Sequence, residues 1–523
     1  MQGGREYLLD TAGVKYLLAR GLENLSAETE ALDIHGINNK SLLDSIGEFT
    51  NLKVVLAYWG GRVKGPTEIV PRSISRLRKL KHLDLRNNQI HSIEADLGLL
   101  ENLEFINLSA NKLETFPSGL LRLYRIKWID ISGNSISTLP DRIGSLTSLE
   151  VFDISGNQMD SLPPSITDLT NLKRLSAANC GFMKIPDSIG KLQNLEYLAL
   201  QGNKPGLDFS KISSLSNLRE LNISSNRNSL LPKFESLTML RHIDLGGMNL
   251  TQFPEGITKL HRLKTLNVSL NQLTSLPREI GRLRSLEVLN LSDNRILMLP
   301  DEIGQLSSLE QLYIYGSWLK VLPQGIAGLS KLEILDLAII DPPRNQLSSI
   351  PSEIGNLLSL RRLNLIGHEI TRIPPEIGNL KQLLELDMGD NPLVFIPNEM
   401  VNLHNLEYFD FSGHRLDEIP SFLCEMENLE IDHIPYSRAS VHIPDCFLSN
   451  ISKHHLLYSA QRFLRDSLYT ASYEIVNHLL GRFPDTSEQE KAKLLTQLDE
   501  LSAAGVQHEA LTRLRARLEL EEE

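Results

Sequence analysis

The sequence predicts an α/β solenoid, in which stacked repeats form a parallel β-sheet on the concave side and short helices on the convex side, followed by a small α-helical C-terminal region. Three observations predict it. A set of leucines recurs every 23 residues, and an asparagine recurs at a fixed place among them. The chain, at 523 residues, also exceeds the size at which one compact core keeps growing.

Composition and charge narrow the classes of function. A net charge of −12 disfavours binding to nucleic acid or anionic membranes, since both need a dense basic surface. No stretch approaches the roughly 18 apolar residues of a membrane span, and residues 1–10 lack the pattern of a signal peptide. Cys180, Cys424 and Cys446 are too few and too scattered for a disulfide framework or a zinc site. We therefore expect a cytoplasmic protein without a metal or cofactor, and its oligomeric state stays open.

The repeated unit reads L-x-x-L-x-L-x-x-N-x-L, as at Leu80, Leu83, Leu85, Asn88 and Ile90. Its first position recurs at Leu80, Leu103, Ile126, Leu149, Leu172, Leu195, Leu218, Leu240, Leu263, Leu286, Leu309, Leu332, Leu360, Leu383 and Leu406. Two weaker copies, around Thr29 and Leu52, bring the total to about 17 repeats. Each L-x-L segment predicts a short strand with inward leucines, and stacking of the repeats aligns these strands into a parallel sheet.

The asparagine at the ninth position predicts a structural ladder, because a buried amide needs hydrogen-bond partners on both its nitrogen and its oxygen. It occurs at Asn88, Asn111, Asn134, Asn157, Asn203, Asn271, Asn294 and Asn391. Cys180, Met248, Ser317, His368 and His414 replace it in single repeats, where we expect local variation rather than chemistry.

These patterns divide the chain. We expect an N-terminal cap, predicted as an amphipathic helix, over 1–28, the repeats over 29–430 with extra loops near 58–70 and 338–344, a transition or C-terminal cap over 431–451, and a helical region over 452–523. The last region holds three amphipathic runs, and either a cap of the repeat array or a module for oligomerisation or partner binding fits them.

The segments between the strands read "LPDRIGSLTSLE" (139–150) or "LPREIGRLRSLE" (276–287). This pattern resembles the intracellular 23-residue leucine-rich-repeat proteins of the Ras-group kind, which include Ras-suppressor-like and scribble-like scaffolds; some bacterial effectors use similar repeats. The resemblance covers about residues 25–430 and implies a leucine-rich-repeat horseshoe. It also implies a non-catalytic scaffold or adaptor in intracellular signalling, with a small GTPase, a kinase or a phosphatase as the protein partner.

Two columns of side chains on the exposed sheet face are candidate partner contacts. The third-position column runs His82, Phe105, Trp128, Val151, Arg174 and Tyr197. An exposed apolar stripe with Trp, Tyr and Arg is typical of binding hot spots; alternatively, Phe105 and Trp128 lie flat on their neighbours or under an N-terminal element. The fifth-position column contains Asp130 and Asp153, which either contact a basic partner or belong to the scaffold.

A second candidate contact surface lies near the longer of the irregular steps, the 28 residues between Leu332 and Leu360. Tyr313 and Tyr315 interrupt the fifth-position column one repeat earlier, together with Trp318. The added segment contains "DPPR", with Asp341 and Arg344, and two prolines stiffen it. It is either a contact loop on the rim or an insertion that the scaffold tolerates.

An alternative hypothesis is that the chain is a bacterial effector with a C-terminal ubiquitin-ligase or other host-directed activity. Cys446, in "IPDCFLS", would be its nucleophile. The roughly 90 residues after the repeats are short for such a domain, and they show no match to that family's cysteine motif. We therefore expect no enzymatic activity in the repeats, and the C-terminal region stays open.

Overall fold

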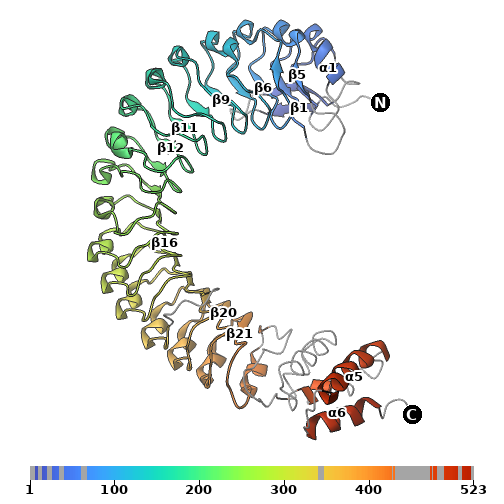
Figure 1. Cartoon of the computed structure of the whole chain (residues 1–523), viewed down its shortest axis with the longest axis vertical. Coiled ribbons are helices and arrows are strands. Elements are labelled where there is room, and N and C mark those ends of the chain that lie inside the picture. Colours follow the sequence, from blue (N-terminus) through green and yellow to red (C-terminus); the bar gives the residue numbers. More distant parts are fainter. Residues whose placement is uncertain are drawn as a thin grey trace. The chain divides into compact units, whose positions relative to one another are not determined.

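The structure is a computed structural model, and it describes residues 6–9, 15–20, 26–34, 40–59, 67–339, 347–426, 428–429, 444, 472–473, 475–476, 478–479, 488–503 and 509–519. The chain divides into two compact units. Unit 1 comprises Met1–Leu250 and Lys259–Asn267, and unit 2 comprises Thr251–Thr258 and Val268–Glu523. Within each unit, strands line one side and short helices line the other (Figure 1).

In unit 1 the strands are β1 (Glu6–Leu9), β2 (Lys15–Arg20), β3 (Ala31–Asp33), β4 (Val54–Leu56), β5 (Ile69–Val70), β6 (His82–Asp84), β7 (Ser92–Ile93), β8 (Phe105–Asn107), β9 (Trp128–Asp130), β10 (Val151–Asp153), β11 (Arg174–Ser176), β12 (Tyr197–Ala199), β13 (Glu220–Asn222), β14 (His242–Asp244) and β15 (Thr265–Asn267). Equivalent positions of successive repeats pair in parallel, for example Phe105 with Trp128 and Trp128 with Val151. The sequence period therefore sets the register of the sheet.

In unit 2 the strands are β16 (Val288–Asn290), β17 (Gln311–Tyr313), β18 (Ile334–Asp336), β19 (Arg362–Asn364), β20 (Glu385–Asp387) and β21 (Tyr408–Asp410), and they also pair in parallel. β18 and β19 keep the register on either side of the added segment, with Ile334 opposite Arg362. Ala338 and Ile339 are buried. Residues 340–346, which hold most of that segment, lie outside the described residues.

The helices between the strands are mostly 3-10 turns. In chain order they are α1 (Lys40–Ser45), η1 (Ile46–Glu48), η2 (Arg72–Arg76), η3 (Leu97–Leu99), η4 (Ser118–Arg122), η5 (Ile143–Ser145), η6 (Pro164–Asp168), η7 (Ile189–Lys191), η8 (Phe209–Ser214), η9 (Phe234–Ser236), η10 (Glu255–Lys259), η11 (Arg278–Arg282), η12 (Asp301–Gln305), η13 (Gln324–Gly328), η14 (Ser352–Asn356), η15 (Pro375–Asn379), η16 (Asn398–Asn402) and η17 (Ser421–Glu425). A proline precedes many of these turns, as at Pro277 before η11, and fixes the backbone where the turn begins. Their central apolar residue, such as Ile280, is buried against the strand leucines.

The asparagine ladder is present as predicted. Asn134 donates from Nδ2 to the carbonyls of Leu108 and Ile131 at 3.0 Å each, and its Oδ1 accepts the N–H of Leu113 at 2.9 Å. Asn226 also belongs to the ladder. His368 replaces the asparagine functionally, because Nε2 bonds the Leu337 carbonyl at 2.9 Å and Nδ1 accepts the N–H of Leu347 at 3.3 Å.

A second asparagine column, which the sequence reasoning missed, stands just before the first leucine of several repeats. Each member donates from Nδ2 to a carbonyl 24 residues earlier, as Asn171 does to Thr147 at 2.8 Å. The members are Asn51, Asn102, Asn171, Asn194, Asn217, Asn405 and Asn428. The recurring "NL" dipeptide was a visible signal for it.

The amphipathic helix predicted for the N-terminal cap over 1–28 is wrong at residues 6–9 and 15–20, which are strands. β1 and β2 form an antiparallel pair, and β2 continues into the parallel sheet through β3. The physical reason is that the first repeat strand leaves an open edge of backbone donors and acceptors, which an added strand satisfies. The apolar runs are also short and are separated by a segment containing Gly13, and helices of such length are marginal.

The described C-terminal helices are α5 (Glu488–Ala503) and α6 (Glu509–Glu519), which contact each other. Leu494, Leu498, Leu511 and Leu514 are buried, in agreement with the predicted amphipathic runs. Arg515 and Asp499 form an ion pair between the two helices.

Candidate binding surface

Three aromatic residues of the third-position column, His82, Phe105 and Trp128, form a run of ring contacts on the sheet face of unit 1. The rings of His82 and Phe105 are parallel, with centroids 3.9 Å apart. Phe105 and Trp128 follow with centroids 5.4 Å apart and planes tilted by 35°. Phe105 is half-buried, whereas Trp128 remains 39% exposed. Phe105 and Trp128 thus pack against neighbouring rings, as the alternative interpretation of this column predicts. Trp128 nevertheless keeps part of its surface exposed to solvent.

The column continues beyond Trp128 with an apolar residue and a cation–π pair. Val151 is half-buried and lies between Trp128 and Arg174 in the strand register. The guanidinium carbon of Arg174 lies 3.9 Å from the centroid of the Tyr197 ring. We call His82, Phe105, Trp128, Val151, Arg174 and Tyr197 the aromatic column. Aromatic stacking orders the column before any partner binds, which lowers the entropy cost of binding.

The fifth-position carboxylates have a structural role that the sequence left open. Oδ1 of Asp130 accepts the N–H of Ser132 at 3.0 Å, and Oδ1 of Asp153 accepts the N–H of Ser155 at 2.9 Å. Asn107 makes the same bond to Ser109 at 2.9 Å. This residue therefore closes the turn that ends each strand, by the local bond typical of Asp and Asn.

Burial disfavours the charged form of two fifth-position carboxylates, Asp153 and Asp84. Burial raises the pKa of Asp153, and the neighbouring Asp130 charge raises it further, against the hydrogen bonds from Ser155 and Ser176. Burial likewise raises the pKa of Asp84, although Arg86 lies close by and forms an ion pair with it at 3.5 Å. In the described part of the chain, Asp130 and Asp153 form no ion pair.

The residues at the second position of successive repeats, which we call the second-position column, form a ladder of opposite charges. Lys127 pairs with Glu104 at 2.9 Å, Lys173 with Glu150 at 2.7 Å, and Arg219 with Glu196 at 3.6 Å. These exposed pairs support the strand register by small amounts, since surface ion pairs are weak. The column is close to neutral and does not compensate the charges of Asp130 and Asp153.

In unit 2 the structure describes Tyr313, Tyr315 and Trp318 but not the added loop. Tyr313 and Tyr315 are half-buried, and the Tyr313 hydroxyl donates to Gln311 Oε1 at 3.1 Å. Trp318 is partly exposed, with the guanidinium carbon of Arg295 5.7 Å from its ring centroid. Asp341 and Arg344 lie outside the described residues, so the rim-loop hypothesis stays a prediction.

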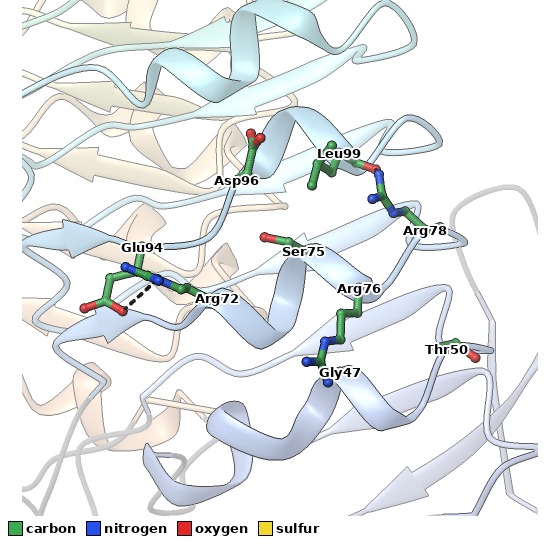
Figure 2. Close-up of a pocket in the computed structure, with 9 residues that line it drawn as sticks. All are labelled: Gly47, Thr50, Arg72, Ser75, Arg76, Arg78, Glu94, Asp96 and Leu99. Atoms are coloured by element: carbon green, nitrogen blue, oxygen red, sulfur yellow. Dashed lines mark hydrogen bonds and ion pairs between the residues drawn. The ribbon is translucent and has the colours of Figure 1, made fainter.

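A hollow of about 590 Å³ lies beside η2 and is lined by Gly47, Thr50, Arg72, Ser75, Arg76, Arg78, Glu94, Asp96 and Leu99 (Figure 2). Its arginines do not converge. Arg72 pairs with Glu94 at 3.8 Å, Arg78 donates to the Leu99 carbonyl at 2.7 Å, and Arg76 lies against Gly47. The hollow is therefore a weaker candidate than the aromatic column.

The described cysteines do not offer a nucleophile. Cys180 is a buried free thiol whose pKa burial raises to about 11, and a reactive cysteine needs a lowered pKa. Cys424 is disulfide-bonded. Cys446, the proposed nucleophile of the ligase alternative, lies outside the described residues. Among the residues that the structure describes, no cluster of metal ligands occurs and no helix is long and apolar enough to cross a membrane.

Comparisons with known proteins agree with this fold. A leucine-rich repeat region model matches residues 118–230 and 217–350, and a model of two leucine-rich repeats matches residues 78–121. The chain also matches a leucine-rich-repeat protein of Leptospira interrogans with 30% identity, covering 74% of this chain and 90% of that protein, at a TM-score of 0.60. The chain belongs to the leucine-rich-repeat family, whose domains generally serve as protein-binding scaffolds.

Two further solved structures are similar. A plant peptide hormone receptor in complex with the peptide RGF2 is 24% identical, with 83% of this chain and 72% of the receptor covered and a TM-score of 0.61. The ectodomain of the Arabidopsis thaliana receptor kinase GASSHO1, solved with Casparian strip integrity factor 2, is 26% identical, with a TM-score of 0.58. That match covers 81% of this chain and 58% of the ectodomain. No curated protein matches the sequence.

Proposed function

We propose that this chain is a non-catalytic scaffold that binds a partner protein on the sheet face of unit 1, with Phe105 and Trp128 as anchors. The observation that carries the proposal is the aromatic column, because the partly exposed Trp128 within it, flanked by Phe105, is the residue type favoured at binding hot spots. Support also comes from the GASSHO1 ectodomain, a 26% identical structure solved with a factor bound.

The proposal includes a role in intracellular signalling, which comes from the resemblance to Ras-group repeat proteins. One observation favours an oxidising compartment instead. Disulfides such as the one at Cys424 form and persist in oxidising compartments. The thiol titration described in the Discussion distinguishes the two settings.

The test of the scaffold is capture of a partner by the double variant Phe105→Ala/Trp128→Ala. We expect it to lose at least about tenfold in affinity, because truncated hot-spot aromatics dominate binding energy. The matched control is Tyr124→Ala, which removes an aromatic that is 75% exposed in the turn between η4 and β9, away from the sheet face. Equal capture by the double variant and wild type, with the fold intact by circular dichroism, would contradict the proposal.

The ligase alternative predicts a different result. A ubiquitin thioester would form on the chain with a suitable conjugating enzyme and disappear in Cys446→Ala. No thioester with a broad panel of conjugating enzymes removes this alternative, whereas a Cys446-dependent thioester would establish it.

A further inference from the structure

The surface around Trp128 combines an exposed aromatic face with two fixed carboxylates. Trp128 and Asp130 lie on the same face of β9, two residues apart, and Asp153 lies opposite Asp130 on β10. Side chains at these positions share one side of the sheet, because strand residues alternate between faces. The three residues therefore form a triangle on two adjacent strands.

Both carboxylates are held in place before a partner arrives. Oδ1 of each accepts a backbone N–H at the strand exit, and Asp130 also accepts the Ser132 hydroxyl at 2.7 Å. The cations near them are already engaged. Lys127 and Lys173 pair with glutamates of the second-position column, and Arg174 stacks on Tyr197. The sheet face at Trp128 thus has a local negative charge that the described residues do not neutralise.

An arginine side chain would complement these three residues in both shape and charge. Its planar guanidinium stacks on the face of a tryptophan and, with its remaining N–H donors, bonds carboxylates in a fork. A lysine ammonium supplies the charge but neither the planar stacking nor the fork. An acidic segment would be repelled by Asp130 and Asp153, and a purely apolar one would leave both charges in a drier environment without compensation.

We propose that the partner segment bound at Trp128 presents an arginine, which stacks on the exposed indole and bonds Asp130 and Asp153. This inference rests on the proposed function, because it specifies the chemistry of the partner on the same surface. It assigns Asp130 and Asp153, which the sequence marks as candidate contacts, to that arginine, and it predicts a basic, not an acidic or neutral, partner segment.

The test uses a library of random 12-residue peptides displayed on phage and selected on the full chain, with counter-selection on Phe105→Ala/Trp128→Ala. We expect the remaining peptides to be enriched in arginine over lysine and over aspartate or glutamate. Their affinity is expected to fall about tenfold or more in Asp130→Asn/Asp153→Asn and to weaken as salt is raised.

The chain offers its own controls for this substitution. Asparagine occupies the same position at Asn107 and Asn222 and makes the same turn-closing bond, so Asp130→Asn/Asp153→Asn is expected to keep the fold. Asp244→Asn removes a carboxylate of equal geometry on β14, four strands from Asp153 along the sheet, and is expected to leave peptide affinity unchanged. Loss of affinity in Asp244→Asn equal to that in the double variant would overturn the proposed contact.

The outcomes separate this inference from the scaffold proposal. Peptides that require Trp128 but show no arginine enrichment, or that bind Asp130→Asn/Asp153→Asn as well as wild type, overturn the arginine contact and leave the scaffold standing. A selection that yields no peptide dependent on Phe105 and Trp128 overturns both.

Discussion

At the scale of single residues, polar side chains fix this fold as firmly as the leucines do. Asn134 bonds four backbone groups in two consecutive repeats while almost fully buried. Asn171, in the asparagine column that stands just before the first leucine of the repeats, makes one hydrogen bond at the surface. The difference in burial predicts different contributions to stability, since a buried group left without a partner costs far more than an exposed one.

Asn134→Ala is therefore expected to lower the free energy of unfolding by about 3 kcal/mol, and Asn171→Ala by about 1 kcal/mol or less. Guanidinium unfolding followed by circular dichroism measures both. Hydrogen exchange would place the larger loss of protection at the repeats on either side of Asn134, because each repeat contacts only its neighbours. Similar losses from the two variants would contradict the assigned roles.

Two ladder positions occupied by histidine make stability depend on pH. Burial lowers the pKa of His368 and of His414 from 6.5 to about 4. Their neutral forms belong to the folded state, so this contribution is complete above pH 6.5 and is lost as pH falls toward 4. Asp387, whose pKa burial and nearby carboxylates raise to about 6, acts in the opposite direction, since its contribution is lost as pH rises through 6.

The variant His368→Asn restores the usual ladder residue and removes one buried imidazole. We expect it to lose less stability than wild type between pH 6.5 and pH 4, measured by denaturant unfolding across that range. Comparison with wild type cancels the opposing effect of Asp387. An unchanged pH profile would show that His368 is not held neutral in the fold.

Among the secondary-structure elements, the strands of the repeats and their register could be predicted from the sequence. The two strands at the N-terminal edge could not. The 23-residue period places Phe105, Trp128 and Val151 opposite one another without any structural information. It does not extend to β1 and β2, which carry no repeat motif and form strands because an open sheet edge lies next to them.

The candidate site was predictable in part. The periodicity identifies the exposed column, but not that Phe105 stacks between His82 and Trp128, because ring orientation depends on side-chain packing that a period does not encode. The hydrogen bonds by which Asp130 and Asp153 close their turns could not be predicted either, because they depend on where each strand ends.

The disulfide at Cys424, at the end of η17, is a local feature that bears on the compartment. Of the chain's three cysteines, Cys180 is free and Cys446 lies outside the described residues, and a disulfide of Cys424 within the chain leaves one thiol. Titration of the unfolded, unreduced chain is expected to yield one thiol, and reduction to yield three. Three thiols before reduction would contradict the bond and favour a reducing compartment.

In the molecule as a whole, the residues that build the repeat array differ from those proposed to bind the partner. Leucines, ladder asparagines and paired charges of the second-position column build the array, while the aromatic column and its flanking carboxylates lie on the exposed sheet face of unit 1. The net charge of −12 adds long-range attraction for a basic partner, which raises association rates at low salt.

Site-specific photocrosslinking can show whether this sheet face holds the partner. A photoreactive benzoylphenylalanine replaces Val151, beside Trp128 in the strand register, or Tyr124, in the turn between η4 and β9. If the partner binds at the sheet face, we expect a covalent adduct from position 151 and none from position 124. An adduct from position 124 with none from position 151 would contradict it.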